Sequence, residues 1–281
     1  MSTLYIEPFS GLAGDMLLSG LCGLANYYEE IVKLPDLIHL SDGKVEIDTV
    51  TKNGIVCKYV RIIDLNQQHS DKLDQTGHDK IHTHEHNHDH HHHHGEHHHP
   101  PHAHRHLKEI LQIIDKGHIS EGAKAIAKEI FTIVGKSEAK IHDMDLDKIH
   151  FHEISAVDSI LDIVGCAVLI DHLEISKTYC DAICTGFGMV KTQHGLLPVP
   201  APATADILLG MPTYPGDEEG ESVTPTGAAI VKYLNPEFSS VDIRRQKIAY
   251  GPGKKDFVRP NVVRLSLLEE EVKKKAQPHQ H

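Results

Sequence analysis

The alternation of apolar and polar residues along the chain predicts an ordered succession of strands and helices. Strands are expected over 3–9, 44–50, 55–65 and 261–267. Helices are expected over 16–24, 106–114, 120–134 and 157–173, with two short ones from Thr204 to Gly210 and from near Thr226. Asn53-Gly54, between the second and third strands, is the strongest short signal for a β-hairpin.

The longest helical pattern has a clear beginning and a clear buried face. Ser120 is a good N-cap residue. Ile126, Ile130 and Val134 recur at four-residue spacing and form an apolar stripe that belongs in a core. The segment 135–144 continues as either a helix or a turn.

A low-complexity segment, Gln67 to Arg105, interrupts this pattern. It is too polar to form a core and is expected to be a disordered insertion. The predicted fold class is therefore α/β, with a mixed sheet and helices interrupted by a His-rich insertion. One domain is expected from 1–66 together with 106–268, followed by a disordered tail over 269–281.

Charge and cysteine content narrow the class of protein. The net charge of −12 argues against nucleic-acid binding, which requires a basic surface. The longest uncharged apolar run near the middle, 163–170, is too short to span a membrane, and no signal peptide is visible. Five scattered cysteines are typical of reduced thiols, so a cytoplasmic location is expected.

The insertion predicts metal binding. Between His78 and His106, 16 of 29 residues are histidine. Neutral imidazole binds late first-row metals, including nickel. The absence of thiolates speaks against a closed structural zinc site, whereas many interchangeable ligands suit metal storage or loading. A histidine run with no metal role is the alternative. The candidate metal ligands are His82, His84, His86, His88, His90, His91, His92, His93, His94, His97, His98, His99, His102 and His104.

The segment 149–165, IHFHEISAVDSILDIVG, concentrates the other candidate chemistry. His150 and His152 are two residues apart and would share one face of a strand. Asp158 and Asp162 are four apart and would share one face of a helix. With Glu153, they are the candidate catalytic residues, placed for metal binding or acid–base work at one junction. The alternative for each aspartate is a structural role, such as helix capping by Asp158.

Two helix starts are candidate anion sites, because the first turn of a helix presents unpaired N–H groups. The first, at Gly14-Asp15, follows a glycine-containing loop, and the second, at Thr226-Gly227, follows a threonine-rich one. Ordinary helix capping is the competing explanation at both. The candidate cofactor-binding residues are Gly11, Gly14, Asp15, His194, Thr224, Thr226 and Gly227.

Several strings together resemble one family. They are FSGLAGDM (9–16), the internal histidine tract, the 149–165 segment, TGFGMVKTQHGLLPVPAPAT (185–204), TPTGAA (224–229) and YGPGKKD (250–256). In this order, and over nearly the whole chain, they resemble the LarC family of nickel-pincer cofactor biosynthesis.

The resemblance implies an activity and partners. Family members are nickel chelatases of the lyase class. They insert Ni(II) into pyridinium-3,5-bisthiocarboxylic acid mononucleotide, using CTP with Mn(II) or Mg(II), and the product serves lactate racemase-type enzymes. Longer members carry a further C-terminal domain associated with CTP binding. This chain resembles their N-terminal portion, so a separately encoded C-terminal portion is an expected partner, and a second copy of the chain is another.

Two further hypotheses come from different functional classes. One is nickel storage or metallochaperone activity without turnover, which the histidine tract would perform. The other is metal-dependent hydrolysis by the His-Glu-Asp cluster, with the tract as an accessory. Deleting residues 78–104 separates the first alternative from an insertase, because an insertase with ample nickel should not need the tract.

Overall fold

A four-stranded mixed sheet is the base of the fold in this computed structural model, which describes residues 1–66, 105–149, 156–192, 194–238 and 243–269. The strand order is β11-β12-β1-β4, with β1 parallel to β4 and the other neighbours antiparallel. The strands are β1 (Ser2–Glu7), β4 (Ile175–Cys180), β11 (Arg245–Pro252) and β12 (Val262–Leu268). The mixed α/β class predicted from the sequence is confirmed.

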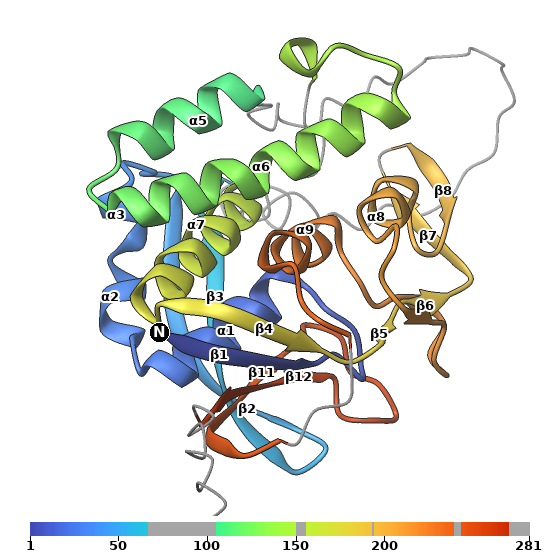
Figure 1. Cartoon of the computed structure of the whole chain (residues 1–281). Helices are drawn as coiled ribbons and strands as arrows, with labels where there is room; N and C mark the ends of the chain where they lie inside the picture. Colours follow the sequence, from blue (N-terminus) through green and yellow to red (C-terminus); the bar gives the residue numbers. More distant parts are fainter. Residues whose placement is uncertain (67–104, 150–155, 193, 239–242, 270–281) are drawn as a thin grey trace, which may run out of the picture.

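Helices are stacked on this sheet (Figure 1). Helix α1 packs against β11 and β12, α7 packs against α1, and α6 packs against α7. The helices are α1 (Gly14–Ala25), α2 (Tyr28–Val32), α3 (Leu34–Leu37), α5 (Leu107–Lys116), α6 (Glu121–Ile141), α7 (Val157–His172), α8 (Pro202–Ile207) and α9 (Pro225–Leu234), with a 3₁₀ turn at η1 (Leu146–Lys148). Among the described residues, none of these helices combines the length and apolarity that crossing a membrane would need.

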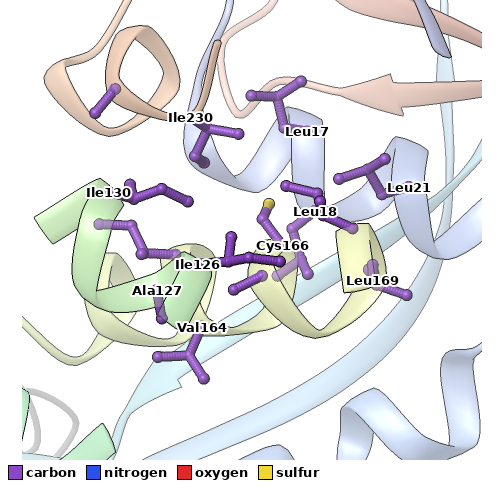
Figure 2. Close-up of a cluster of buried hydrophobic side chains, with 14 of the residues drawn as sticks. Leu17, Leu18, Leu21, Ile126, Ala127, Ile130, Val164, Cys166, Leu169 and Ile230 are labelled. Carbon is purple, nitrogen blue, oxygen red and sulfur yellow. The ribbon is translucent and has the colours of Figure 1, made fainter. Parts of the chain in front are cut away.

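The core lies where α1, α6, α7 and α9 meet. Figure 2 shows the side chains of these four helices converging on one cluster. Its members include the predicted stripe residues Ile126 and Ile130, both at least nine-tenths buried. Burial of each such side chain contributes about 1.5–3 kcal/mol, so this cluster is a main source of stability.

The hairpin β2 (Gly43–Lys52) and β3 (Ile55–Asp64) confirms the turn prediction. Its strands pair in unbroken register from Gly43 with Asp64 to Lys52 with Ile55. Asn53 and Gly54 both have positive φ, at 47° and 86°. Two consecutive positive φ values are what a two-residue type I′ turn requires.

The long helix α6 begins as predicted and ends later. The Ser120 hydroxyl accepts a hydrogen bond from the Ala123 N–H at 3.1 Å. The helix then continues to Ile141, so most of the segment left open between helix and turn is helical. Helix α8 begins at Pro202, two residues before the predicted start at Thr204. Proline has a φ suited to the first helical position and no N–H to lose there, which explains the earlier start.

Several short strands form the part of the molecule beside α8 (Figure 1). They are β5 (Ile183–Cys184), β6 (Gly186–Phe187), β7 (Met189–Thr192), β8 (Gly195–Pro198), β9 (Thr213–Tyr214) and β10 (Gly220–Glu221). They pair as β5–β9, β6–β10 and β7–β8. The predicted His-rich insertion and the C-terminal tail lie outside the described residues, apart from Arg105 and Glu269.

Candidate functional site

A cavity of about 270 Å³ lies where the first turns of α1, α7 and α9 approach the turn that follows β11. Four chain segments that are far apart in sequence therefore supply its walls. The volume is just below the range of small-molecule sites, about 300–1,000 Å³. One part of its lining, the acidic wall, carries carboxylates, and another part, the basic wall, carries lysines.

The acidic wall consists of Asp15, Asp158 and Asp162. Asp15 is the second residue of α1, and the other two lie one turn apart on α7, as their spacing predicted. Asp15 and Asp162 are only 7% and 8% exposed. A β-carbon at Gly14 would lie 2.7 Å from Asp162 Oδ2, so the glycine lets α1 approach this carboxylate.

Burial has the largest effect on the pKa values of Asp15 and Asp162 in this wall. It raises the pKa of Asp162 well above its ordinary value, and the charges of Asp15 and Asp158 raise that pKa further. Burial also raises the pKa of Asp15, against the opposing effects of Lys254 and of hydrogen bonds from Tyr59 and Met16. Asp162 Oδ1 is buried and has no hydrogen-bond partner within the described part of the chain. A positively charged ligand would satisfy this oxygen and relieve the repulsion between the carboxylates.

The hairpin contributes a group that the sequence did not mark as functional. Tyr59 of β3 donates a hydrogen bond from its hydroxyl to Asp15 Oδ2 at 3.1 Å. Burial, together with the negative charge of Asp15, raises the pKa of Tyr59, which keeps the hydroxyl protonated as a donor. Tyr59 thus fixes one oxygen of Asp15, and Asp15 Oδ1 accepts the N–H of Met16 at 2.9 Å.

The basic wall consists of Lys254 and Lys255. Lys254 Nζ lies 3.7 Å from Asp158 Oδ2, and its side chain is 62% exposed. Lys255 Nζ donates to the Glu221 carbonyl oxygen at 3.1 Å. Lys52, at the end of β2, holds the turn beneath them by donating to the Lys255 carbonyl at 3.1 Å and to Asp256 Oδ1 at 2.6 Å.

The start of α9 completes the cavity. The Thr224 side chain caps the helix by accepting the Gly227 N–H at 3.2 Å, and it lies 2.9 Å from the Thr226 hydroxyl. Thr224 and Thr226 line the cavity, whereas Gly227 and Gly11 do not. Those glycines permit close packing: a β-carbon at Gly227 would collide with the Leu12 carbonyl, and one at Gly11 with the Ser222 carbonyl.

The fold brings together only part of the predicted site. Asp158, Asp162, Gly14, Asp15, Thr224 and Thr226 line one cavity. His194 lies instead in the turn between β7 and β8, with its ring centroid 4.9 Å from that of His142. His150, His152, Glu153 and the histidines of the tract from His82 to His104 lie outside the described residues.

Helix capping accounts for the position of Thr224 but not for the positions of the aspartates. The N-cap residues of α1 and α7 are Ala13 and Ala156, and neither makes a side-chain capping hydrogen bond. Asp158 Oδ1 accepts the N–H of its neighbour Ser159 at 3.0 Å. The aspartates therefore line the cavity without serving as N-caps.

The lysines and Tyr59 were missed because pattern alone places neither the turn after β11 nor the hairpin beside α1. The string YGPGKKD (250–256), whose first three residues end β11, is a usable signal for the lysines. Within the described residues, no three His, Cys, Asp or Glu side chains form a ready-made metal ligand set. The cavity is instead a mixed site, with one wall suited to a cation and the other to an anion.

The structure defines a mixed α/β protein with a small cavity lined by both carboxylates and lysines. Comparison with known proteins defines the family. The model of a family described as nickel insertion protein matches residues 4–280. The chain belongs to the nickel insertion protein family.

Individual relatives agree with this family. The chain is 41% identical over 277 residues to a protein of Clostridium acetobutylicum, covering 96% of this chain and 65% of the relative. It is 37% identical over 269 residues to one of Staphylococcus epidermidis, covering 95% and 60%. Both are named pyridinium-3,5-bisthiocarboxylic acid mononucleotide nickel insertion protein. The chain thus spans less than two thirds of these curated relatives. No solved structure matches it.

Proposed function

We propose that this chain binds pyridinium-3,5-bisthiocarboxylic acid mononucleotide in the cavity and takes part in inserting Ni(II) into it. The observation that carries the proposal is the pairing of a buried carboxylate wall with a lysine wall in one cavity. The substrate combines a phosphate and two thiocarboxylates with a metal ion to be inserted. Such a pair of substrates requires donors for anions and ligands for a cation side by side.

The two walls have separate roles in this proposal. Lys255 and the first turn of α9 bind the phosphate, because helix N-termini and ammonium groups both attract anions. Asp15, Asp158 and Asp162 attract the divalent ion to the acidic wall before transfer, although among the described residues they do not form a ready-made ligand set. Carboxylate oxygens are hard ligands, so they hold nickel less firmly than sulfur does, which favours its passage to the thiocarboxylates.

Finer features of the proposal rest on the resemblance to the LarC family. The activity is that of a nickel chelatase of the lyase class, dependent on CTP with Mn(II) or Mg(II). The acidic wall fits such a hard ion as well, since Asp162 Oδ1 is a buried oxygen with no partner in the described part of the chain. A C-terminal portion supplies the CTP-dependent step, and a lactate racemase-type enzyme receives the product in the cytoplasm. Self-association of the chain is a further element of the proposal.

Nickel insertion into the purified mononucleotide tests the proposal, with and without CTP and with and without a C-terminal portion from a longer relative. Asp158→Ala should lower the insertion rate by at least about 10-fold, the scale on which groups supporting a metal site act. Asp147→Ala, at an exposed position of η1, is the matched control and should leave the rate unchanged. Bulk nickel binding by the histidine tract should be unaffected in both variants. An undiminished rate in Asp158→Ala would remove the cavity from the reaction.

The histidine tract favours a second candidate function, nickel storage. A stretch in which 16 of 29 residues are histidine is a dense set of nickel ligands. Deleting residues 78–104 separates the two functions at saturating nickel. An insertase keeps its insertion rate, whereas a storage protein loses nearly all of its bound nickel and has no insertion rate to keep. A metal-dependent hydrolase would instead release product from a phosphate ester with no nickel present.

A further inference from the structure

Lys254 occupies a special position in the cavity because it is the positive charge nearest to the acidic wall. Its Nζ lies 3.7 Å from Asp158 Oδ2, beyond hydrogen-bonding distance. Its side chain is 62% exposed. Ion pairs of this exposed kind are weak, because solvent screens the charges and a long side chain must be held in place. Lys254 is therefore a loosely held counter-ion.

The acidic wall needs more positive charge than Lys254 supplies. Asp162 is more than nine-tenths buried and lines the cavity, and its Oδ1 has no hydrogen-bond partner in the described ranges. Asp15 is equally buried and has both oxygens hydrogen-bonded, one to Tyr59 and one to the Met16 N–H. A buried carboxylate oxygen without a partner is costly, and a bound cation removes that cost.

Hydrogen bonds from Lys52 hold the backbone at Lys254 and Lys255, whereas the side chain of Lys254 is mostly exposed. Lys52, whose side chain is only 10% exposed, bonds to the turn from below. Lys255, the next residue, is engaged with the Glu221 carbonyl beside the start of α9. Lys254 thus carries a largely exposed ammonium on an anchored turn, and of the two lysines in the basic wall it is the one that lies beside Asp158.

We infer that Lys254 couples the two halves of the cavity, pairing with Asp158 when no divalent cation is bound and turning to a ligand phosphate when one is. A divalent cation at the carboxylates displaces the ammonium and frees it for the phosphate. A phosphate that attracts the ammonium likewise removes a competing charge from the carboxylates. Because linkage is reciprocal, each ligand must raise the affinity for the other by the same factor.

This inference rests on the proposed function, since it assumes that one cavity binds both ligands. It adds cooperative binding of the two ligands to that function. The empty cavity binds either ligand weakly and the pair tightly, so a metal ion is retained mainly when the phosphorylated ligand is present. The class of ligand pair is a divalent cation with the phosphate monoester of a pyridine nucleotide.

Binding of Mn²⁺ to the full chain, measured by electron paramagnetic resonance of the free ion, tests the coupling. Mn²⁺ stands at the weak end of the series for nitrogen ligands, so the histidine tract contributes little. Asp162→Asn keeps every histidine and gives the background. The phosphorylated probe is nicotinate mononucleotide, which carries a pyridinium ring, a ring carboxylate and a phosphate.

For the unmodified chain, saturating nucleotide should tighten Mn²⁺ binding by about 5- to 20-fold, within the usual range of coupling between sites. Lys254→Met should bind Mn²⁺ more tightly than the unmodified chain when no nucleotide is present, and its coupling factor should fall to about one. Lys254→Arg keeps the charge and should retain the coupling. Lys191→Met, at an exposed position of β7 outside the cavity lining, should behave like the unmodified chain.

Two results would overturn the inference while leaving the proposed function intact. Full coupling in Lys254→Met would mean that the ion and the phosphate contact each other directly. Weaker Mn²⁺ binding in Lys254→Met would make the lysine a structural support. If instead Asp162→Asn bound Mn²⁺ as well as the unmodified chain, the carboxylates would not be the cation site. The proposed function would then fail together with the inference.

Discussion

At the scale of single residues, the buried charges separate into those that the fold satisfies and those that it leaves for a ligand. Glu7 in β1 is 6% exposed and receives hydrogen bonds from both Arg245 and Arg264. Asp162 is equally buried, yet one of its oxygens has no partner within the described residues. Both carboxylates lie in the described core region, so burial alone does not mark a site. The site is marked instead by Asp162 Oδ1, the oxygen that lacks a partner among the described residues.

Glu7 allows a prediction on stability. Burial by itself raises its pKa, but hydrogen bonds from Arg264 and Arg245 outweigh this and hold the pKa below the ordinary value. Glu7→Gln should lower the free energy of unfolding at pH 7 by about 1.5–3 kcal/mol, the range for hydrogen bonds to charged groups. Urea titration monitored by circular dichroism measures the change.

The same variant makes the pH dependence testable. A carboxyl whose pKa is depressed by folding contributes stability above its unfolded pKa, about 4.3, and loses it as the pH falls through the folded value. The difference between the unmodified chain and Glu7→Gln should therefore be constant near neutrality and shrink below about pH 4.3. Glu46→Gln, in a more exposed pair with Arg61, should change stability much less than Glu7→Gln does, because solvent screens the exposed pair. A difference that grew on acidification would contradict this account.

At the scale of elements, the β2–β3 hairpin does more than cover α1. Its strand ends place Lys52 beneath the turn after β11, and its middle places Tyr59 against Asp15. The turn chemistry of Asn53-Gly54 sets the register, and the register decides which hairpin side chains face Asp15 and the turn after β11. A segment to which the sequence assigned no chemistry thus supports both walls of the site.

Lys52 gives a prediction at this scale. Lys52→Met removes the hydrogen bonds that hold the turn carrying Lys254 and Lys255 but leaves the hairpin pairing unchanged. Affinity for nicotinate mononucleotide should fall by about 5-fold, the equivalent of one hydrogen bond of ~1 kcal/mol. Isothermal titration calorimetry measures it. Lys58→Met, exposed on the same hairpin, is the control. Equal affinity in the two variants would show that the turn needs no anchor.

At the scale of the whole molecule, the cavity exists only because distant segments meet. Asp15, Asp158, Thr224 and Lys254 come from four different parts of the chain, and the packing of α1, α7 and α9 brings them together. A ligand that contacts all four segments binds the folded chain and not the unfolded one. Ligand binding should therefore be visible as stabilisation of the entire described fold.

This leads to a prediction on thermal unfolding. With Mn²⁺ and nicotinate mononucleotide each at about 100 times its dissociation constant, each ligand should add about 2.7 kcal/mol to the stability of the unmodified chain. Differential scanning calorimetry should show the midpoint rising with ligand concentration. Asp162→Asn should lose the contribution of Mn²⁺. A midpoint that did not depend on ligand concentration would place both ligands elsewhere.

The sequence by itself determined many of the elements and part of the site. Periodicity set α6 and α7, Asn53-Gly54 set the hairpin, and the four-residue spacing of Asp158 and Asp162 put both on one helix face. These features depend on neighbours in the chain, so local physical chemistry suffices to predict them. Strands β4 and β11 escaped prediction because they lie at the edges of the sheet and lack clean alternation, with burial in β4 limited largely to Thr178 and Cys180.

Tertiary structure alone decided which charges face one another. Lys254 opposes Asp158, Tyr59 holds Asp15, and His194 lies beside His142 instead of in the cavity. No sequence spacing encodes these relations, because each joins segments whose separation in space is set by how the helices pack on the sheet. The burial that leaves Asp162 Oδ1 without a partner among the described residues has the same origin. Sequence therefore supplied the chemical groups, and packing turned them into a cavity with one wall for a cation and one for an anion.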